Sequence, residues 1–359
     1  MEKIKLDDLC VPSARQIKED PDKLIDYIDI ASVDNENKKV TGFQTMSFGE
    51  APSRARKAVK KGSILVSTVR PNLNAVAILE DDTPNVSVAS TGFCILNCKD
   101  NVDNRFVFNF CKSKAFIEDM VSQATGASYP AVSDNIVRSA LVPNYPYEEQ
   151  CHISEILDRV SSAIEKRKVE LAILDDLIKA RFVEMFGDSV KNSKRLPTVL
   201  GETLFRLSNG KALPSNERFP EGIPAYGGNG VSWYTDKILC DFDTIIVGRV
   251  GFQSGNVHLA KAPLWVTDNA MYISSLNTEI CDMRFLCALM EHIDFTRYQD
   301  AGDLKKITQK PFMQMHYPMP SMQAQMQYID FSNQTDKSKV AVQKALDEAQ
   351  LLFDSLMQK

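Results

Sequence analysis

The sequence has 359 residues, of which 44 % are hydrophobic and 25 % are charged, a composition typical of a globular protein with two or three domains. No apolar run approaches the roughly 20 residues that a membrane-spanning helix needs, and the start Met1-Glu2-Lys3-Ile4 does not resemble a signal peptide. We therefore expect a cytoplasmic protein without a membrane partner. The net charge of −5 disfavours binding to nucleic acid, although the local distribution of charge matters more than its sum.

The first region, residues 1–146, predicts a domain of mixed α and β structure. Residues 62–79 (GSILVSTVRPNLNAVAIL) are typical of two strands joined by a polar loop, and a further strand is expected within 85–96. Residues 102–124 place Phe106, Phe110, Ile117 and Val121 at intervals of four and seven, which predicts one amphipathic helix. A loop marked by glycine and proline, followed by a short strand, is expected in 126–143.

The second region, residues 147–188, predicts a single long helix that ends at Gly187. Its apolar residues follow alternating steps of three and four, as in a heptad seam, and two arginines occupy the remaining seam positions. A helix of this length needs a partner along its seam. The seam residues are Leu157, Val160, Ile164, Arg167, Leu171, Leu174, Ile178, Arg181 and Met185.

The third region, residues 189–320, repeats the first. Residues 243–260 (DTIIVGRVGFQSGNVHLA) match 62–79 at an offset of 181, and a helix in 281–299, a loop in 300–310 and a strand in 311–320 follow in the same order. The entries to the two long helices, 142–150 and 317–325, match at an offset of 175. The sequence therefore indicates an internal duplication.

The fourth region, residues 321–359, predicts a second long helix. Its expected seam is Val342, Ala345, Ala349, Leu352 and Leu356, although packing on its own domain alone is an open alternative. We expect an α+β protein with two globular α/β domains in a pseudo-twofold arrangement, separated by an antiparallel coiled coil of the two long helices. Two half-sites that lie one helical turn apart on duplex DNA are about 34 Å from each other. Two long helices could set such a spacing.

Motifs for catalysis, cofactors and metals are missing from the sequence. Asn144-Tyr145-Pro146-Tyr147 has its proline out of place for the Asn-Pro-Pro-Tyr tetrapeptide of amino-methyltransferases, and Gly210-Lys211 lacks the rest of a phosphate-binding loop. The four histidines have no metal-ligand spacing, and the eight cysteines, without a Cys-x-x-Cys pair, are expected to be reduced core residues. We expect no catalytic residue, no cofactor and no metal.

Acidic residues are absent from 51–79 and from 244–267, which include the whole first copy of the repeated segment and all of the second copy except its first residue, Asp243. Arginine, asparagine and glutamine hydrogen bond to base edges, whereas lysine serves phosphates as a point charge. We expect base contacts from Arg70, Asn72, Asn74, Arg249, Gln253, Ser254 and Asn256, and further DNA contacts from Ser128 and Tyr129 in the matching loop of the first domain. We expect phosphate contacts from Arg54, Arg56, Lys57, Lys60, Lys61, Lys305 and Lys306. A solvated charge or a turn-forming asparagine is the alternative for each.

The chain resembles the specificity subunits of Type I restriction–modification systems, most clearly in residues 148–187 (EEQCHISEILDRVSSAIEKRKVELAILDDLIKARFVEMFG), 244–251 (TIIVGRVG) and 265–272 (WVTDNAMY). In the first copy Ser67–Arg70 take the place of Gly248–Gly251, and Val88–Thr91 that of Val266–Asn269. The resemblance implies a non-catalytic subunit whose two domains each read one half of a split, asymmetric DNA target. It also implies that two modification subunits dock on the spacer to methylate adenines, and that restriction subunits can join them.

In that case S-adenosylmethionine and ATP belong to the partner subunits. The alternative function is a stand-alone adaptor that binds protein or RNA through its duplicated domains and self-associates through its heptad helices. The difference between the two sets of loops favours the DNA reader, because a homodimeric adaptor has little need for a duplication with unlike loops.

Overall fold

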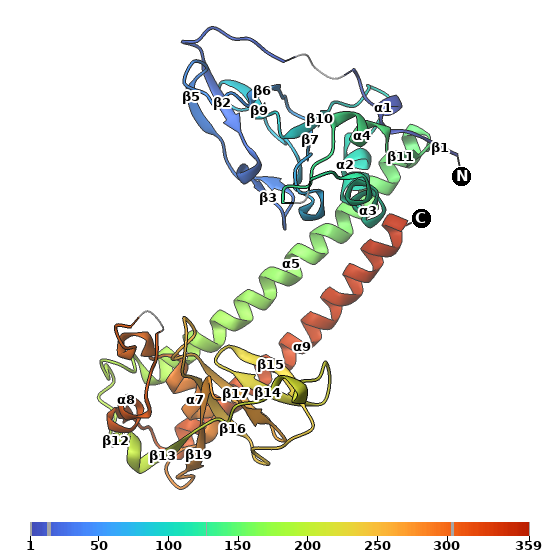
Figure 1. Cartoon of the computed structure of the whole chain (residues 1–359). Helices are drawn as coiled ribbons and strands as arrows, with labels where there is room; N and C mark the ends of the chain where they lie inside the picture. The colour runs from blue at the N-terminus through green and yellow to red at the C-terminus, as the bar shows by residue number, and fades with distance from the viewer. Residues whose placement is uncertain (1, 13–15, 127, 303–304, 359) are drawn as a thin grey trace. The chain divides into compact units, whose positions relative to one another are not determined.

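The computed structural model describes residues 2–12, 16–126, 128–302 and 305–358, apart from the side chains of 357 and 358 (Figure 1). The chain forms two compact units: the first unit comprises residues 1–168 and 343–359, and the second unit comprises residues 169–342. The two predicted long helices are confirmed as α5 (Tyr147–Phe186) and α9 (Met322–Gln358), and each contributes one part to either unit. Across the described residues, no helix is long and apolar enough to cross a membrane.

The first unit contains, within its described residues, one five-stranded sheet, one four-stranded sheet and one strand pair. Their strand orders are β10-β7-β8-β4-β3, β5-β2-β9-β6 and β1-β11. The strands are β1 (Lys3–Lys5), β2 (Leu24–Ile28), β3 (Val33–Asp34), β4 (Lys39–Val40), β5 (Gln44–Ser47), β6 (Ala55–Ala58), β7 (Ile64–Ser67), β8 (Val76–Ile78), β9 (Val86–Ser90), β10 (Phe93–Leu96) and β11 (Leu141–Pro143). The short helices are α1 (Leu6–Leu9), α2 (Asn104–Lys112), α3 (Lys114–Gln123), α4 (Asp134–Ser139) and the 3-10 turns Ile30–Ser32 and Pro71–Leu73.

Three predictions for the first unit need correction. Residues 102–124 form two helices, because Ser113 leaves the helical conformation and its Oγ accepts the Phe116 amide (3.1 Å), starting α3 on a new face. Phe116 and Met120 are therefore buried in α3, whereas Val121 is 44 % exposed. Residues 85–96 form two strands in different sheets, and the loop expected in 126–143 contains α4, which Ser133 caps.

The second unit repeats this plan with shorter sheets. Within its described residues the strand orders are β13-β19-β16-β17, β15-β14-β18 and β12-β20. The strands are β12 (Thr198–Leu200), β13 (Phe205–Asn209), β14 (Ile223–Gly227), β15 (Gly230–Thr235), β16 (Thr244–Gly248), β17 (Val257–Ala260), β18 (Trp265–Val266), β19 (Ala270–Leu276) and β20 (His316–Pro318). The short helices are α6 (Gly201–Leu204), α7 (Met283–Glu291), α8 (Gln309–Gln314) and the 3-10 turns Ser215–Glu217 and Phe295–Tyr298.

Matching hydrogen bonds support the duplication. Gln150 accepts the amide of Asp103, the N-cap of α2, through Oε1 (3.0 Å), and Gln325 accepts the amide of Asp282, the N-cap of α7, in the same way (2.9 Å). The Nε2 groups donate to the carbonyls of Tyr145 (2.8 Å) and Pro320 (2.9 Å), respectively. Both glutamines are buried. In both copies, the same hydrogen bonds therefore connect the start of a long helix to the start of a short one.

The long helices also follow most of the predicted seam. Leu157 and Ile164 are buried in the first unit, and Phe182 and Phe186 of α5 are buried in the second. Within the second unit, Asp175 pairs with Lys339 (2.5 Å), and Arg181 lies over the Phe331 ring (5.5 Å). As residue numbers rise along α5, those of its α9 partners fall, so the two helices are antiparallel there. The helix α5 ends at Gly187 as predicted, with φ +75°.

Two predicted seam residues, Arg167 of α5 and Leu352 of α9, are exposed. Leu352 of α9 is 51 % exposed, whereas its neighbours Leu346 and Phe353 are half-buried. The ring of Phe353 lies 5.3 Å from the ammonium of Lys112, at the end of α2. In the first unit the packed face of α9 therefore includes Phe353 and not Leu352.

Candidate nucleic-acid interface

Each unit brings the loop of the repeated segment beside a second loop from later in the chain. In the first unit the amide of Arg70 donates to the Pro130 carbonyl (2.7 Å), and the amide of Val132 donates to the Thr68 carbonyl (2.9 Å). In the second unit the amide of Gly251 donates to the Lys305 carbonyl (2.8 Å), and the amide of Ile307 donates to the Arg249 carbonyl (2.9 Å). The repeat thus preserves a backbone platform on which the side chains differ.

These hydrogen bonds define which residues correspond. Arg70 and Gly251 occupy the same position, and both adopt the left-handed conformation, with φ +49° and +86°. Arg249 therefore corresponds to Thr68 rather than to Arg70. The Thr68 amide donates to Gly92 (2.8 Å) and the Arg249 amide to Asn269 (2.9 Å), so Thr91 corresponds to Asp268, one residue away from the expected match with Asn269.

In the first unit the two loops bring together a group of predicted residues. The guanidinium of Arg70 lies 4.8 Å from the centre of the Tyr129 ring, and Tyr129 itself is 69 % exposed. Asn72 and Ser128 are exposed in the same pair of loops. The Arg54 carbonyl accepts the Thr91 amide (2.8 Å), which places this exposed arginine at the same end of β7. An exposed ring under an arginine can stack on bases or pack against sugars.

Other predicted residues of the first unit are engaged elsewhere. Asn74 is 7 % exposed and donates from Nδ2 to the Cys111 carbonyl (2.9 Å). Lys57 donates to the Phe93 carbonyl and pairs with Asp134, both at 2.6 Å. Arg56 lies over the Phe48 ring (4.9 Å) and is half-buried. These contacts hold each polar group within the fold.

Lys60 and Lys61 are exposed but lie apart from Arg70. They precede β7, whereas Arg70 follows it, and they border a cavity with Asn97, Lys99 and Tyr147, the first residue of α5. Lys61 also pairs with the exposed Asp81 (3.2 Å). Strand β6 and the turn after it lead from one end of β7 to the other. The basic residues in 54–61 are therefore spread along the unit.

In the second unit the loop between β16 and β17 presents Phe252, which is 94 % exposed, and the exposed Gln253. Asn256 donates from Nδ2 to the side-chain oxygen of Gln253, which orients both amides. Arg249 is half-buried and donates to the Asp268 carbonyl (3.2 Å). Ser254 is fully buried, so its side chain cannot reach a ligand at the loop surface.

The second loop of this unit contributes Lys305 and Lys306. Lys305 is half-buried and Lys306 is exposed, and the Lys306 amide donates to the Asp300 carboxylate (2.9 Å). Asp268 and Asp300 thus lie beside the basic residues of the platform, although residues 244–267 contain no acidic residue. The sequence pattern did not predict the place of either aspartate, because both lie outside the repeated segment.

Phe252 was not predicted as a site residue. The sequence did contain a signal for this residue. Phe252 is an aromatic residue directly between Gly251 and Gln253, so no adjacent residue is apolar. Among the described residues, no group of three or more His, Cys, Asp or Glu side chains is placed to hold a metal ion.

Burial lowers the pKa of one lysine, Lys38, close to the first platform. Lys38 donates from Nζ to the Asn74 carbonyl (2.6 Å), and burial lowers the pKa of its ammonium, an effect that Asp34 partly opposes. This lysine fastens the start of β8 to the hairpin of β3 and β4. It therefore supports the loop from within and does not add charge to its surface.

Comparisons with known proteins relate this chain to one family. Residues 1–173 match the family model described as the Type I restriction modification DNA specificity domain. The EcoprrI specificity subunit of Escherichia coli is 23 % identical over 262 residues, 67 % of this chain and 63 % of that protein. The HindI specificity subunit of Haemophilus influenzae is 28 % identical over 156 residues, 42 % of this chain and 34 % of that protein. The chain thus matches less than two thirds of the length of either relative.

Two solved structures share the fold. A chain from a structure titled for complex assembly and conformational transition of the type I R-M system has a TM-score of 0.64 at 19 % identity, covering 100 % of this chain and 96 % of that one. The S subunit of a Type I restriction–modification system from M. genitalium has a TM-score of 0.63 at 17 % identity, covering 99 % and 94 %. These similarities confirm the mixed α/β fold with its long central and C-terminal helices.

Proposed function

We propose that this chain is a specificity subunit of a Type I restriction–modification system, that is, the DNA-reading, non-catalytic subunit of such a complex, because residues 1–173 match the DNA specificity domain of that family. The observation that carries the proposal is the pair of equivalent platforms, one in each unit, with matched backbone hydrogen bonds and unlike side chains. Matched platforms suit the repeating backbone of duplex DNA, and unlike side chains suit two different half-sites.

In the first unit we propose that Arg70 and Asn72 contact base edges, with Tyr129 and Ser128 beside them. Arg54 would contact phosphate at the same end of the unit, and Lys60 and Lys61 would serve phosphates only where the DNA extends past β7. Arg56, Lys57 and Asn74 support the fold and are left out of the interface. The exposed positions of the retained residues support this division.

In the second unit we propose that Gln253, Asn256 and Arg249 contact base edges, that Phe252 inserts against a base or sugar, and that Lys305 and Lys306 contact phosphate. The fully exposed ring of Phe252 would become buried on binding, which is a favourable use of an aromatic side chain. Ser254 is left out because it is buried.

The wider assembly follows from the same proposal. The working division is two recognition domains, 1–146 and 189–320, and two spacer segments, 147–188 and 321–359, in a pseudo-twofold arrangement. The spacer segments would form one antiparallel coiled coil, set the gap between half-sites and dock two modification subunits, to which restriction subunits can be added. The antiparallel contacts within the second unit support this arrangement. The complex would act in the cytoplasm, where host DNA is accessible.

Co-expression with a cognate modification subunit tests the function. Methylated adenines are mapped in host DNA by single-molecule sequencing, with the modification subunit alone as the control. We expect a split, asymmetric motif that appears only when this chain is present. A stable, soluble complex that adds no methylation and does not bind duplex DNA would contradict the proposal and favour the adaptor function.

A further inference from the structure

A tight turn of the second unit lies beside the loop between β16 and β17, which carries several of the proposed DNA contacts. Residues 227–230 (GGNG) join β14 to β15, and Gly227 pairs with Gly230, which leaves Gly228 and Asn229 as a two-residue turn. Gly230 adopts φ +97°, a conformation that favours glycine. None of the DNA contacts proposed above comes from this turn.

The backbone of the turn touches the backbone of the second unit's platform at Gly248, where β16 ends and the β16–β17 loop begins. A Cβ atom on Gly248 would lie 2.7 Å from the carbonyl oxygen of Gly228 and 3.2 Å from its Cα atom. A side chain at position 248 would therefore push the two segments apart. Arg249, one of the proposed base contacts, is the next residue along the chain. The turn is thus held directly beside the platform.

The duplication shows which segment of the first unit corresponds to this turn. Ile28 of β2 pairs with Ala89 of β9, and Tyr226 of β14 pairs with Val266 of β18, both in parallel register. Ala89 and Val266 occupy the same position, because each lies three residues before the carbonyl that accepts the platform amide. Ile28 therefore corresponds to Tyr226.

The first unit fills the matching place in a different way. Ile30 takes the position of Gly228, and Ala31 takes that of Asn229. A Cβ atom on Gly92 would lie 2.9 Å from Cδ1 of Ile30, so the isoleucine side chain packs over the platform there. The chain then continues into β3 and β4 instead of returning at once through β5. Only the second unit therefore brings a tight turn, with an amide side chain, to this place.

The side chain of Asn229 is free to bind a ligand. Asn229 is exposed, and among the described residues none supplies a hydrogen-bond partner for its amide. By contrast, the amides of Asn256 and Gln253 in the neighbouring loop hydrogen bond to each other. An asparagine amide has one donor and one acceptor side, which match N6 and N7 of adenine in the major groove of DNA. Its chemistry therefore suits a base contact better than a phosphate contact.

We propose that Asn229 is a further base-reading residue of the second unit and that it recognises an adenine next to the base pairs contacted by Arg249 and Gln253. This inference rests on the proposed function, because it requires the platform to lie on duplex DNA. It concerns one half of the target only, since Ala31 at the matching position of the first unit has no amide.

Methylation by the assembled complex tests the proposal. Complexes of the cognate modification subunit with the wild-type chain or with Asn229→Ala are given duplexes that carry the wild-type motif or one changed base pair. We expect Asn229→Ala to reduce discrimination by about 5- to 150-fold at one A·T base pair of one half, with every other position unchanged. A loss that is equal on all duplexes would indicate a phosphate contact and overturn the proposal.

Asn229→Asp is a second variant that keeps the size of the side chain and removes its donor. A carboxylate accepts from N4 of cytosine, so the preference for adenine at that base pair should disappear. A motif that both variants leave unchanged would overturn this inference alone. A wild-type complex that methylates no motif would instead contradict the proposed function itself.

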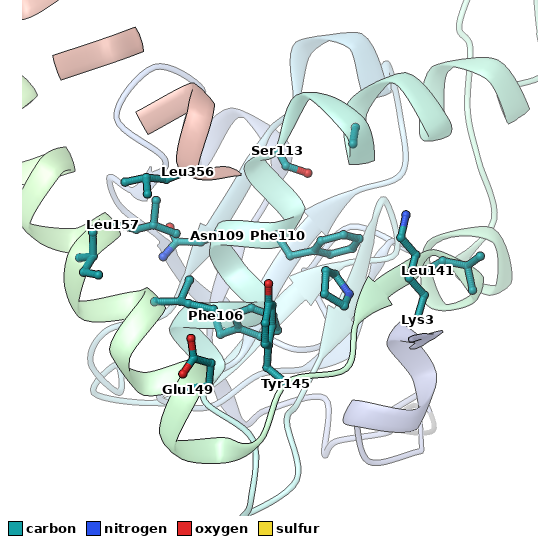
Figure 2. Close-up of a pocket in the computed structure, with 14 residues that line it drawn as sticks. Lys3, Phe106, Asn109, Phe110, Ser113, Leu141, Tyr145, Glu149, Leu157 and Leu356 are labelled. Carbon is teal, nitrogen blue, oxygen red and sulfur yellow. The ribbon is translucent and has the colours of Figure 1, made fainter. Parts of the chain in front are cut away.

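One control change in each unit lies away from the platforms. Thr278→Ala alters an exposed side chain beyond the opposite end of β19 from Asn269. In the first unit, Leu141 is 56 % exposed beside a cavity of about 390 Å³ that also contains the buried Asn109, and no proposed DNA contact lines this cavity (Figure 2). Thr278→Ala and Leu141→Ala should leave both halves of the motif unchanged.

Discussion

Lys112, the last residue of α2, places an ammonium group among aromatic rings. The Nζ atom lies 4.5 Å from the Phe108 ring and 5.3 Å from the Phe353 ring, and burial lowers its pKa from 10.5 to about 8. Because the pKa is lower in the folded state, the folded protein holds this proton less tightly than the unfolded chain does. The charged side chain therefore destabilises the fold below about pH 8, and this penalty disappears as the pH rises toward 10.5.

We expect Lys112→Met to raise the free energy of unfolding at pH 7 by about 1 to 2 kcal/mol, since the lost ring contacts offset part of the relieved burial cost. The gain should shrink as the pH approaches 10.5. Denaturant unfolding at pH 7 and at pH 10 measures the difference, with the exposed Lys114→Met as the control. A gain that is equal at both pH values would rule out the charge as its cause.

Gln150 and Gln325 act at the level of elements, because each joins the start of a long helix to the start of a short one. Gln325 accepts the Asp282 amide and donates to the carbonyls of Pro320 and Ile280, all at 2.9 Å. Without it, buried backbone groups at three places would lack partners. Such side-chain hydrogen bonds fix the angle at which the short helix packs on the long one. They occur in both copies.

Gln325→Leu should destabilise the second unit by about 2 to 4 kcal/mol, because buried groups lose their partners without any gain in packing. Hydrogen exchange at Asp282 and Met283 should become faster, and the melting temperature should fall. Gln327→Leu, an exposed change on the same helix, should leave both nearly unchanged. If the two variants behaved alike, the hydrogen bonds would have no special role.

The whole molecule carries two platforms whose proposed DNA-reading side chains differ. Arg70 lies over Tyr129 in the first unit, whereas Arg249 stands at the position of Thr68 and beside the exposed Phe252 in the second. Unlike side chains on a shared backbone frame are suited to unlike half-sites. A change in one platform should therefore leave the other half of a target unaffected.

Arg249→Ala should relax or weaken recognition of one half of the DNA target by about 1 to 3 kcal/mol, and Arg70→Ala should do so for the other half. Methylation motifs of the assembled complex, mapped for each variant, measure the effect, with the exposed Lys191→Ala as the control. Equal losses at both halves in either variant would contradict the assignment of one half-site to each unit.

The periodic parts of the sequence were predictable. The strands within 62–79 and 243–260 and both long helices form where the pattern places them, because burial of one face requires regular spacing. The break at Ser113 was missed, since a capping hydroxyl competes with an otherwise continuous helical pattern. Among the site predictions, Asn74 and Ser254 proved buried, because residue type indicates what a side chain can bind but not whether it is exposed.

The sequence by itself determined the duplication, the two long helices and the place of the two loops that we propose read DNA, since these depend on local periodicity and on repetition along one chain. Only the tertiary structure decided which polar side chains remain free. It turned Lys57 inward to Asp134, left Phe252 fully exposed, and placed Asn109 in a cavity without a partner. Contacts between residues tens of positions apart settle such outcomes, and their burial and hydrogen bonding depend on how the packed elements meet.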